Sequence, residues 1–348
     1  QKTMGEVAKL RLATVIPVLN EADYIEACLE GLLHQTIDPT SHMILVLDGG
    51  STDGTPALVE RLIAEHTGPQ WPQLVLAANP NKTVAHARNL AMEMLPESVE
   101  YVVEMIGHAQ VDRNHLKHRL DAWEACESTV GERLAGVGVR VVGVEQKTSQ
   151  VAAWVDGALA SPLGRSGGQF SQFAAVSETS TPAFVMHRRA SVVAVNGWDE
   201  DFLTSQDSEL SMRLIKAGFV LHRHPLPEVM MHKRQHLGNW WKMGHRYGFW
   251  RTKVLLKHPT RAKWQEFLPL VGLLLTGVVF LLGSPLYWFL PACYGLALLL
   301  AGVHQTVVQS RFSALLGVPL CLLMLHASFS IGLVDGLVRK GRQSSDRG

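Results

Sequence analysis

The sequence predicts the α/β fold class, with a mostly parallel sheet, followed by helices hydrophobic enough to enter a membrane. In the first half of the chain, short apolar runs rich in β-branched residues alternate with amphipathic segments, which is typical of strands joined by helices. Residues 267–338, in contrast, are mostly Leu, Val, Ala, Gly and Phe. The 348-residue chain has a formal net charge of +1, so bulk binding of nucleic acid is not expected.

Each secondary-structure element is predicted from its own pattern. Four short apolar runs are expected to be strands: 12–18, 43–47, 74–77 and 101–106. Apolar residues at helical spacing predict helices at 23–33, 56–64, 84–94 and 208–217. Alternation of strand and helix implies parallel strands with right-handed crossovers, and ligands of such sheets bind beyond the carboxyl ends of the strands.

Two carboxylates, Glu21 and Asp48, follow the first two strands and so fall at the edge of the sheet where a ligand is expected. A carboxylate can accept a hydrogen bond from a nucleobase or a ribose, and the glycines of the 48–55 run (DGGSTDGT) let the backbone approach closely. The alternative is that Asp48 and Asp53 only cap a turn and a helix, an explanation that fits Asp53 better. The run has neither the P-loop nor the dinucleotide-fingerprint spacing, which argues against an ATPase or a dehydrogenase.

Two cations lie near the third crossover. Lys82, in a turn, and Arg88, on the 84–94 helix, are candidates to face a diphosphate. The alternative for each is a solvated position on the surface.

The run Ser205–Leu210 (SQDSEL) places Asp207 and Glu209 at the start of the 208–217 helix. Asp207 is expected at about the N-cap and Glu209 in the first turn. A carboxylate there can deprotonate an acceptor hydroxyl, which has a very high pKa and needs a base as it attacks. The alternative is structural, since acids at helix starts are favoured by capping and by the helix dipole.

Five motifs in order carry a family resemblance over roughly residues 10–260. They are VIPVLNEADYI at 15–25, LDGGSTDGT at 47–55, AHARNLAME at 85–93, NGWDEDF at 196–202 and QDSELSMRLIKAGF at 206–219. The chain thereby resembles the inverting glycosyltransferases of family 2, which have the Rossmann-like GT-A fold. With HRYGFWRTKVLLKHP at 245–259 and a hydrophobic tail, it is most similar to the succinoglycan-type exopolysaccharide transferases, membrane enzymes that extend polyprenyl-linked sugars.

The resemblance implies roles for individual residues. Asp207 would be the general base, and Glu209 would support it or bind the acceptor. The nucleotide would be bound by Pro17, Asn20, Glu21, Asp48, Lys82 and Arg88. The acceptor side would be formed by Trp198, Asp199 and Gln206.

One departure from the family concerns the metal. The family usually has an Asp-x-Asp after its fourth strand, where this chain has Ile106-Gly107-His108. His108 with a distant partner such as His232 could hold Mn²⁺ or Mg²⁺, and imidazole suits Mn²⁺ better. Alternatively the metal binds mainly through the substrate diphosphate, or Lys and Arg neutralise the phosphates without metal. His108 could also be merely a hydrogen-bonded histidine at the sheet end, and Glu104 lies about 13 Å away on a straight strand.

A basic, Trp-rich region follows. His232, Arg234 and Arg246 are the candidates to bind the diphosphate, while the remaining cations would rest on anionic lipid headgroups with Trp at the interface. Nucleic acid could use the same cations, but the hydrophobic tail argues against it.

Three apolar segments are expected to enter a membrane: 267–282, 287–303 and 313–338. A span needs about 20 residues, so the first two could form a tight hairpin. Gly317, Gly332 and Gly336 would allow close packing of the third. The predicted domains are a GT-A catalytic domain, juxtamembrane helices, membrane segments and a basic tail, at 1–225, 226–265, 266–338 and 339–348.

The predicted location is the cell membrane, crossed several times, with the catalytic domain in the cytoplasm where nucleotide sugars are found. Three full spans would then place the basic tail outside, against the positive-inside tendency. Either the tail breaks that rule, or one segment is re-entrant or lies in the interface.

The sequence therefore predicts an inverting transferase that moves a hexose from a UDP-sugar to a lipid-linked or polysaccharide hydroxyl in exopolysaccharide synthesis. Three alternatives stay open. A polyprenyl-phosphate glycosyl synthase has an ionised phosphate as nucleophile and needs no base. A non-catalytic membrane scaffold that binds nucleotide sugars would explain Ile106. A processive synthase with a channel is disfavoured by the few membrane segments and the lack of a clear QxxRW motif.

Overall fold

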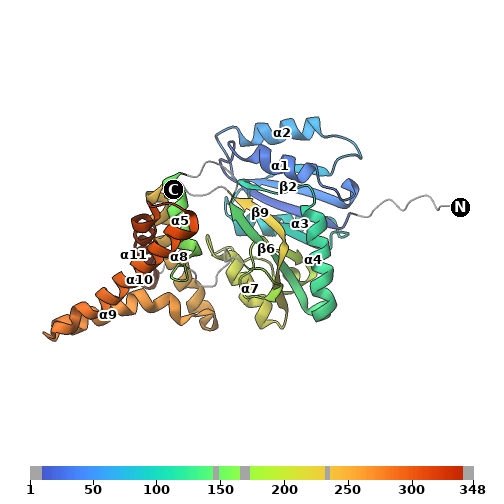
Figure 1. Ribbon diagram of the computed structural model, residues 1–348. Coiled ribbons are helices and arrows are strands. Elements are labelled where there is room, and N and C mark those ends of the chain that lie inside the picture. The colour runs from blue at the N-terminus through green and yellow to red at the C-terminus, as the bar shows by residue number, and fades with distance from the viewer. Residues whose placement is uncertain (1–9, 144–148, 165–172, 232–235, 340–348) are drawn as a thin grey trace. The chain divides into compact units, whose positions relative to one another are not determined.

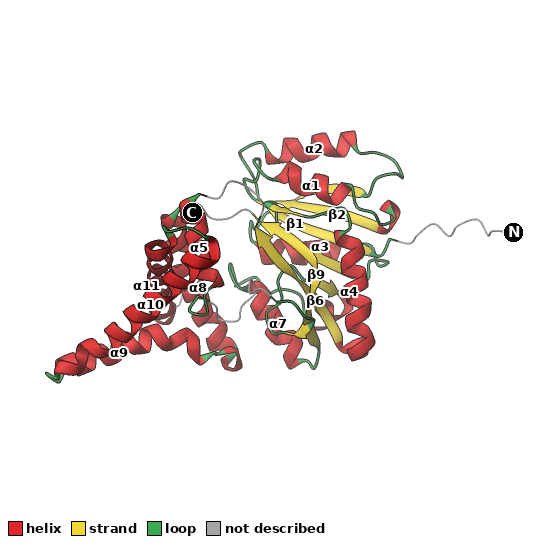
Figure 2. Ribbon diagram, viewed as in Figure 1, coloured by secondary structure: helices red, strands yellow, loops and turns green. Residues whose placement is uncertain are grey.

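The computed structural model describes residues 10–143, 149–164, 173–231 and 236–339 (Figure 1). The chain divides into two compact units, an α/β unit (1–144 with 172–232) and a helical unit (145–171 with 233–348). In the part of the chain that the structure describes, all strands lie in the first of these (Figure 2). The predicted domain boundaries themselves stay predictions.

The first half of the sheet is parallel, as the sequence predicts. Its strands are β1 (Leu12–Val18), β2 (His42–Asp48), β3 (Gln73–Ala78) and β4 (Tyr101–Glu104). Each of the pairs β1–β2, β2–β3 and β1–β4 is parallel. The strand β4 ends two residues earlier than predicted, so the 105–108 segment is a loop beyond the sheet edge.

The second half of the sheet is mixed. Its strands are β5 (Ala109–Gln110), β6 (Leu134–Gly143), β7 (Ser177–Glu178), β8 (Met186–Arg188) and β9 (Val220–Met231). Among the described residues the sheet has nine strands in the order β3-β2-β1-β4-β8-β6-β9-β5, with β7 paired to β9. Strand β8 is antiparallel to both β4 and β6, and it therefore joins the parallel half to the β6–β9 pair.

Helices cover both faces of the sheet. They are α1 (Ile25–Leu33), α2 (Thr55–Glu65), α3 (Val84–Met94), α4 (His115–Val130), α6 (Arg189–Ala194) and α7 (Gln206–Lys216), with short 3-10 turns at Pro39–Ser41 and Gly131–Arg133. Alternate residues of β1 face opposite sides: Ile16 packs under α1 and α2, and Val15 packs against α3. Helix α4 shares the face of α1 and α2, whereas α6 and α7 share the face of α3.

The helical unit contains α5 (Gln150–Ala160), α8 (Leu237–Lys257), α9 (Leu268–Leu281), α10 (Phe289–Gln309) and α11 (Ala314–Val338), with 3-10 turns at Pro259–Arg261, Trp264–Phe267 and Pro285–Trp288. Three segments of the described chain are long and apolar enough to cross a membrane: Trp264–Leu281, Pro285–Gln309 and Ala314–Val338. Large apolar side chains of α9 and α10 are exposed, among them Leu281 and Val307. Such surfaces fit lipid better than water.

Helix α5 joins this unit although it lies between two strands in the sequence. The indole nitrogen of Trp154 donates to Ser313 Oγ at 3.2 Å, and Val155 packs with Val318 of α11. A Cβ atom at Gly317 would collide with the Trp154 ring. The predicted packing role of Gly317 is thus confirmed, with α5 as its partner.

Two of the predicted interfacial tryptophans are instead part of the protein core, which corrects that prediction. Trp240 and Trp250 are buried, and the Trp240 indole donates to the Cys321 carbonyl at 2.8 Å. Trp264 and Trp241 are exposed. Only part of the Trp-rich region is therefore available to an interface.

Helices α8 and α11 approach closely along a seam of small residues. A Cβ atom at Gly248 would collide with the Phe329 carbonyl, and one at Gly332 with the His245 carbonyl. Gly336 likewise faces the Phe249 carbonyl at 2.6 Å from its Cβ position. Close packing at Gly332 and Gly336 is thus confirmed, since only glycine lets the two backbones come this near.

We expect Gly248→Leu to destabilise the helical unit strongly, because the added side chain would push α8 away from α11. Overpacking of this kind costs about 1–3 kcal/mol or more. The measurement is the melting temperature of the full chain in detergent. Gly277→Leu on α9 is the matched control, since a Cβ there meets none of the described residues within 4 Å. Equal melting temperatures for the two variants would contradict the conclusion that close packing of α8 on α11 requires glycine.

Candidate active site

Two loops at the carboxyl ends of β1 and β2 are tied together by side chains. The Asn20 backbone nitrogen donates to Ser51 Oγ at 2.8 Å, and the Thr52 nitrogen donates to Asn20 Oδ1 at 2.9 Å. Asn20 adopts a left-handed conformation with φ of 56°. The structure therefore brings the predicted Asn20 and the 48–55 run into one surface.

Asp48 holds its own turn. Its carboxylate accepts from the backbone nitrogens of Gly50 at 2.9 Å and Ser51 at 3.0 Å, and from Ser51 Oγ at 2.5 Å. The capping alternative for Asp48 is thus present in this structure, and its contact with a nucleotide stays a prediction. The Lys82 ammonium lies beside the same turn, 3.9 Å from the Cβ position of Gly50.

Asp53 is a local cap, as its sequence position indicates. Its carboxylate accepts from Thr55 Oγ1 at 2.6 Å, from the Thr55 nitrogen at 3.1 Å and from the Ala22 nitrogen at 2.9 Å. The hydrogen bond from the Thr55 side chain, followed by that from Ala22, lowers the pKa of Asp53. This carboxylate therefore ties the two loops together.

Glu21 and His108 form a hydrogen-bonded pair at the carboxyl ends of β1 and β4. His108 Nδ1 lies 2.8 Å from Glu21 Oε1, and the Tyr24 ring meets the imidazole edge-on at 6.3 Å between centroids. A Cβ at Gly107 would lie 2.9 Å from Glu21 Cγ, so glycine lets the loop approach Glu21. A proton on Nδ1 would satisfy this bond and leave Nε2 as a ligand atom.

Ile106, at the position of the missing acid, is partly buried. Its side chain packs against the core that α1 covers, and its carbonyl accepts from Cys28 Sγ at 3.5 Å. A carboxylate here would be pushed into apolar surroundings. His108 is exposed to 37%, and Glu21 to 18%, so solvent and ligands can reach this pair.

Two of the predicted diphosphate residues, His232 and Arg234, lie outside the described residues. The described part of β9 ends at Met231, which pairs with Ala109, the residue after His108. Arg246 lies on α8 in the helical unit and is half-buried. The roles of all three stay predictions.

Arg88 lies in a buried ionic cluster. Its Nη1 is 3.2 Å from Glu104 Oε1, and His187 Nε2 lies 3.1 Å from the same oxygen. The side chains of Arg88 and Glu104 are only 7% and 4% exposed. Burial alone would raise the pKa of Glu104, but Arg88 and His187 outweigh it and lower the pKa to about 2. The alternative of a solvated Arg88 is wrong, and the burial also argues against the predicted contact of Arg88 with a diphosphate.

The 196–200 turn is fixed by Asn89, a residue not among the predicted site residues although its helix carries one of the family motifs. Asn89 Oδ1 accepts from the Trp198 nitrogen, and Nδ2 donates to the Trp198 carbonyl, both at 2.8 Å, and to Glu200 Oε1 at 3.0 Å. Trp198 itself is only 2% exposed and packs with α7. Asp199 accepts from the Asp201 nitrogen at 2.9 Å. The predicted acceptor contact of Trp198 is therefore disfavoured by its burial.

Helix α7 begins at Gln206, two residues before the predicted start. Ser205, with φ of 64°, is the N-cap, so Asp207 is the second helical residue and not the N-cap. Asp207 is half-buried, and its Oδ1 accepts from the Ser208 nitrogen at 2.8 Å. The Oε1 atom of Gln206 is buried without a hydrogen-bond partner among the described residues.

Glu209 is in a different state from Asp207. It is 0% exposed, and Arg213 donates to its two oxygens through Nε at 2.9 Å and Nη2 at 2.7 Å. Arg213 Nη1 also donates to the Val195 carbonyl. Glu209 therefore fixes α7 to the preceding loop and is not placed to meet an acceptor directly.

Comparisons with known proteins identify the family of the chain. A family model described as Glycosyl transferase family 2 matches residues 14–191. The succinoglycan biosynthesis protein ExoA of Rhizobium meliloti (strain 1021) is 29% identical over 290 residues, which cover 81% of this chain and 83% of that protein.

Two further proteins resemble the chain over nearly its whole length. A dolichyl N-acetyl-alpha-D-glucosaminyl phosphate 3-beta-D-2,3-diacetamido-2,3-dideoxy-beta-D-glucuronosyltransferase of Methanococcus voltae is 24% identical, covering 94% of this chain and 97% of that protein. The solved mannosyltransferase PcManGT of Pyrobaculum calidifontis, in complex with GDP-Man and Mn²⁺, has a TM-score of 0.64 at 17% identity, covering 96% of this chain and 89% of that chain. At this identity the structural likeness shows a shared fold.

Proposed function

The chain belongs to glycosyl transferase family 2, and from this premise we propose that it transfers a hexose from a nucleotide sugar to an acceptor hydroxyl with inversion. It is a glycosyltransferase of the GT-A fold with three C-terminal segments apolar enough to span a membrane. The scaffold alternative is disfavoured, because the family of the chain and its Methanococcus voltae relative are named as glycosyltransferases.

The contrast between Asp207 and Glu209 carries the proposal. Glu209 is fully buried and forms a salt bridge with Arg213, whereas Asp207 is half-buried in the first turn of α7. In the proposed reaction the acceptor oxygen bonds to the anomeric carbon as its bond to the diphosphate breaks. The acceptor proton passes to Asp207 during this single displacement. Asp207 lies in the first turn of α7, at the positive end of the helix dipole.

The nucleoside diphosphate would leave from the surface formed by the 19–24 and 48–55 loops. Asn20, Glu21 and Asp48 lie there at the carboxyl ends of β1 and β2, with Lys82 beside the turn. Lys82 supplies positive charge to a phosphate. A solved structure of similar fold is a complex with GDP-Man, which supports a nucleotide sugar as the donor, and we propose UDP as the nucleotide here.

The Glu21–His108 pair fits a divalent cation. His108 offers Nε2 and Glu21 holds the ring through Nδ1, an arrangement common among histidine ligands. Bound there, Mn²⁺ would supply charge that stabilises the leaving diphosphate. Imidazole favours Mn²⁺ over Mg²⁺, and His232 stays the proposed second histidine.

Removal of metal is expected to stop transfer. EDTA treatment should lower the rate at least about tenfold, and added Mn²⁺ should restore it better than Mg²⁺. His108→Ala should raise the Mn²⁺ concentration needed for half-maximal rate, because it removes the imidazole. His86→Ala is the control, since His86 binds Asn79 and not Glu21. Activity unchanged by EDTA would contradict a required metal ion. Lys82 and other cationic side chains would then be the groups that stabilise the leaving diphosphate.

The acceptor is proposed to be a lipid-linked glycan. The Methanococcus voltae relative is named for a dolichyl-linked substrate, and ExoA for succinoglycan biosynthesis. Segments able to span a membrane would hold the chain where such lipids are found. We propose a plasma-membrane enzyme of exopolysaccharide synthesis whose α/β unit faces the cytoplasm.

A transfer assay with the full chain in nanodiscs tests the proposal. UDP- and GDP-sugars are offered with Mn²⁺ and a polyprenyl-diphosphate sugar as acceptor, and the anomer of the product is read by NMR. Inversion with a new sugar–sugar bond is expected. A retained anomer would overturn the mechanism, and transfer only to polyprenyl phosphate would favour the synthase alternative.

A further inference from the structure

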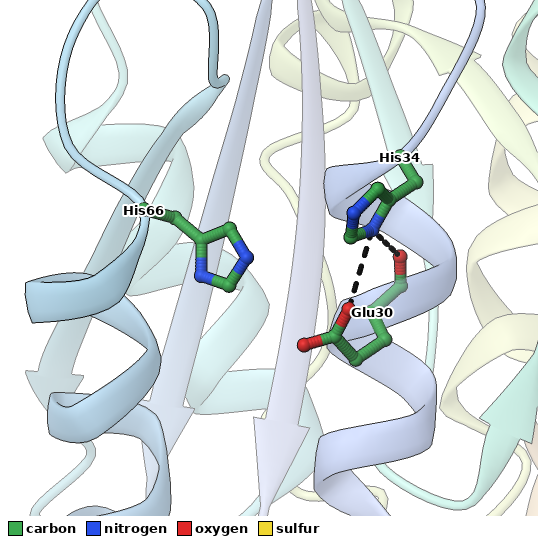
Figure 3. Close-up of side chains that lie close together, drawn as sticks. All are labelled: Glu30, His34 and His66. Carbon is green, nitrogen blue, oxygen red and sulfur yellow. Dashed lines mark hydrogen bonds and ion pairs between the residues drawn. The ribbon is translucent and has the colours of Figure 1, made fainter.

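Three side chains outside the candidate active site meet at the ends of two neighbouring helices. They are Glu30 of α1, His34 at the end of α1 and His66 at the end of α2, and Figure 3 shows them facing one another. One possible ligand atom of each lies within 4.8 Å of those of the other two. We propose that these residues bind a transition-metal ion of the Zn²⁺ class, which clamps α1 to α2.

The geometry is close to that of a metal site. Ligand atoms at about 2.0–2.1 Å from Zn²⁺ in a tetrahedral site are roughly 3.4 Å apart. In this structure the possible ligand atoms lie within 4.8 Å of one another. Rotation of the side chains by about 1 Å or somewhat more would bring them to the separation that a metal site needs. Glu30 and His34 are 41% and 45% exposed, so an ion can enter from solvent.

Hydrogen bonds restrict the orientation of both imidazoles, and Nδ1 of His34 also lies 3.2 Å from Glu30 Oε2. His66 Nδ1 lies 2.9 Å from the Leu62 carbonyl, and His34 Nδ1 lies 3.0 Å from the Glu30 carbonyl. Protons on these Nδ1 atoms would satisfy the carbonyls and leave both Nε2 atoms with lone pairs. Histidine ligands commonly have such an outer hydrogen bond, which fixes tautomer and ring orientation. In Figure 3 the far edge of the His66 ring points toward Glu30 and His34.

Two further features favour a cation here. His34 and His66 are the C-cap residues of α1 and α2, so two helix C-termini, each partly negative, converge on the cluster. The Trp71 ring meets both imidazoles edge-on, with centroid distances of 5.1 Å to His34 and 4.4 Å to His66. Trp71 therefore restricts both rings before any ion binds.

The donor set selects the class of ion. Two imidazoles and one carboxylate suit Zn²⁺, Co²⁺ or Ni²⁺, whereas Mg²⁺ and Ca²⁺ prefer oxygen ligands. Without an ion, the Glu30–His34 contact is a surface pair at 3.2 Å, a kind of interaction that contributes little. The ion would add a link between α1 and α2 to the exposed Glu26–Arg61 pair.

Calorimetric titration of the full chain with Zn²⁺ tests the proposal, in detergent, free of nucleotide and without a polyhistidine tag. One equivalent is expected to bind at the cluster and to raise the melting temperature, since an ion that binds the folded state stabilises it. His66→Gln and His34→Gln should each weaken binding by at least about tenfold and abolish the shift.

His108→Gln is the matched control. It removes a histidine from the candidate active site and should leave both the Zn²⁺ stoichiometry at the cluster and the melting shift in place. Wild-type affinity in His66→Gln and His34→Gln would overturn the proposal, as would the lack of saturable Zn²⁺ binding to the wild-type chain. None of these measurements depends on glycosyl transfer, so the proposed function is tested separately.

Discussion

Asp207→Asn is expected to lower the rate of glycosyl transfer at least about 100-fold while nucleotide-sugar binding survives. Asparagine keeps the shape of the side chain and can still accept the hydrogen bond from the Ser208 nitrogen. It cannot take the acceptor proton. The rate is measured with saturating donor and acceptor, and donor binding by thermal shift.

Asp201→Asn is the control for the loss of a negative charge near α7. Asp201 is exposed in the turn that precedes the helix, and the variant should keep the wild-type rate within about twofold. Turnover retained in Asp207→Asn would exclude Asp207 as the base. It would instead favour a nucleophile that is already ionised, as a lipid phosphate is.

The second large effect is expected from Glu104→Gln, which should destabilise the α/β unit by about 3–5 kcal/mol. The variant leaves the Arg88 guanidinium buried without the carboxylate that lies 3.2 Å away. Thermal unfolding should shift down by roughly 10 °C. The measurement is the melting temperature of the full chain at neutral pH.

Glu100→Gln is the matched control for Glu104→Gln. Glu100 pairs with Arg11 at 2.8 Å, but the side chains are 47% and 55% exposed, so the pair contributes about 0–1 kcal/mol. Equal losses in the two variants would contradict the importance of burial. Replacing Arg88 by Met together with Glu104→Gln should restore part of the stability, because the unpaired charge is then removed.

The pH dependence of the same pair has a definite sign. The pKa of Glu104 is lowered from 4.5 to about 2 in the folded chain, so the unfolded chain binds its proton first on acidification. Its stabilising contribution is therefore complete above about pH 4.5 and is lost as the pH falls toward 2. Glu104→Gln should flatten the fall in melting temperature over that window.

The parallel half of the sheet could be predicted because each strand is a short apolar run followed by a helix of clear period. The mixed half could not. Strand β8 is only three residues long, and it pairs with β4, which lies more than 80 residues earlier in the sequence. Helix α5 could not be assigned either, since Trp154 finds Ser313 only in the folded chain.

Site residues show the same limit. The Glu21–His108 pair joins residues that are 87 positions apart, so no local sequence pattern could predict this contact. The sequence predicted that Arg88 faces a diphosphate or solvent, but the structure buries it against Glu104 at the end of β4. Glu209 is different, because its partner Arg213 lies four residues on in the same helix. That i,i+4 spacing was visible in the sequence and could have separated the two acids at once.

The membership of α5 in the helical unit bears on how the protein is made. The chain enters that unit at residue 145, leaves it after 171 and returns at 233. During synthesis α5 therefore leaves the ribosome long before its partners on α11 are made. Until then the apolar side chains of Val155 and Ala158 lack the residues they pack against. A nascent chain in this state exposes apolar surface, which invites chaperones or early contact with the membrane. No single cut of the gene can separate the two units, because each is assembled from pieces on both sides of the other.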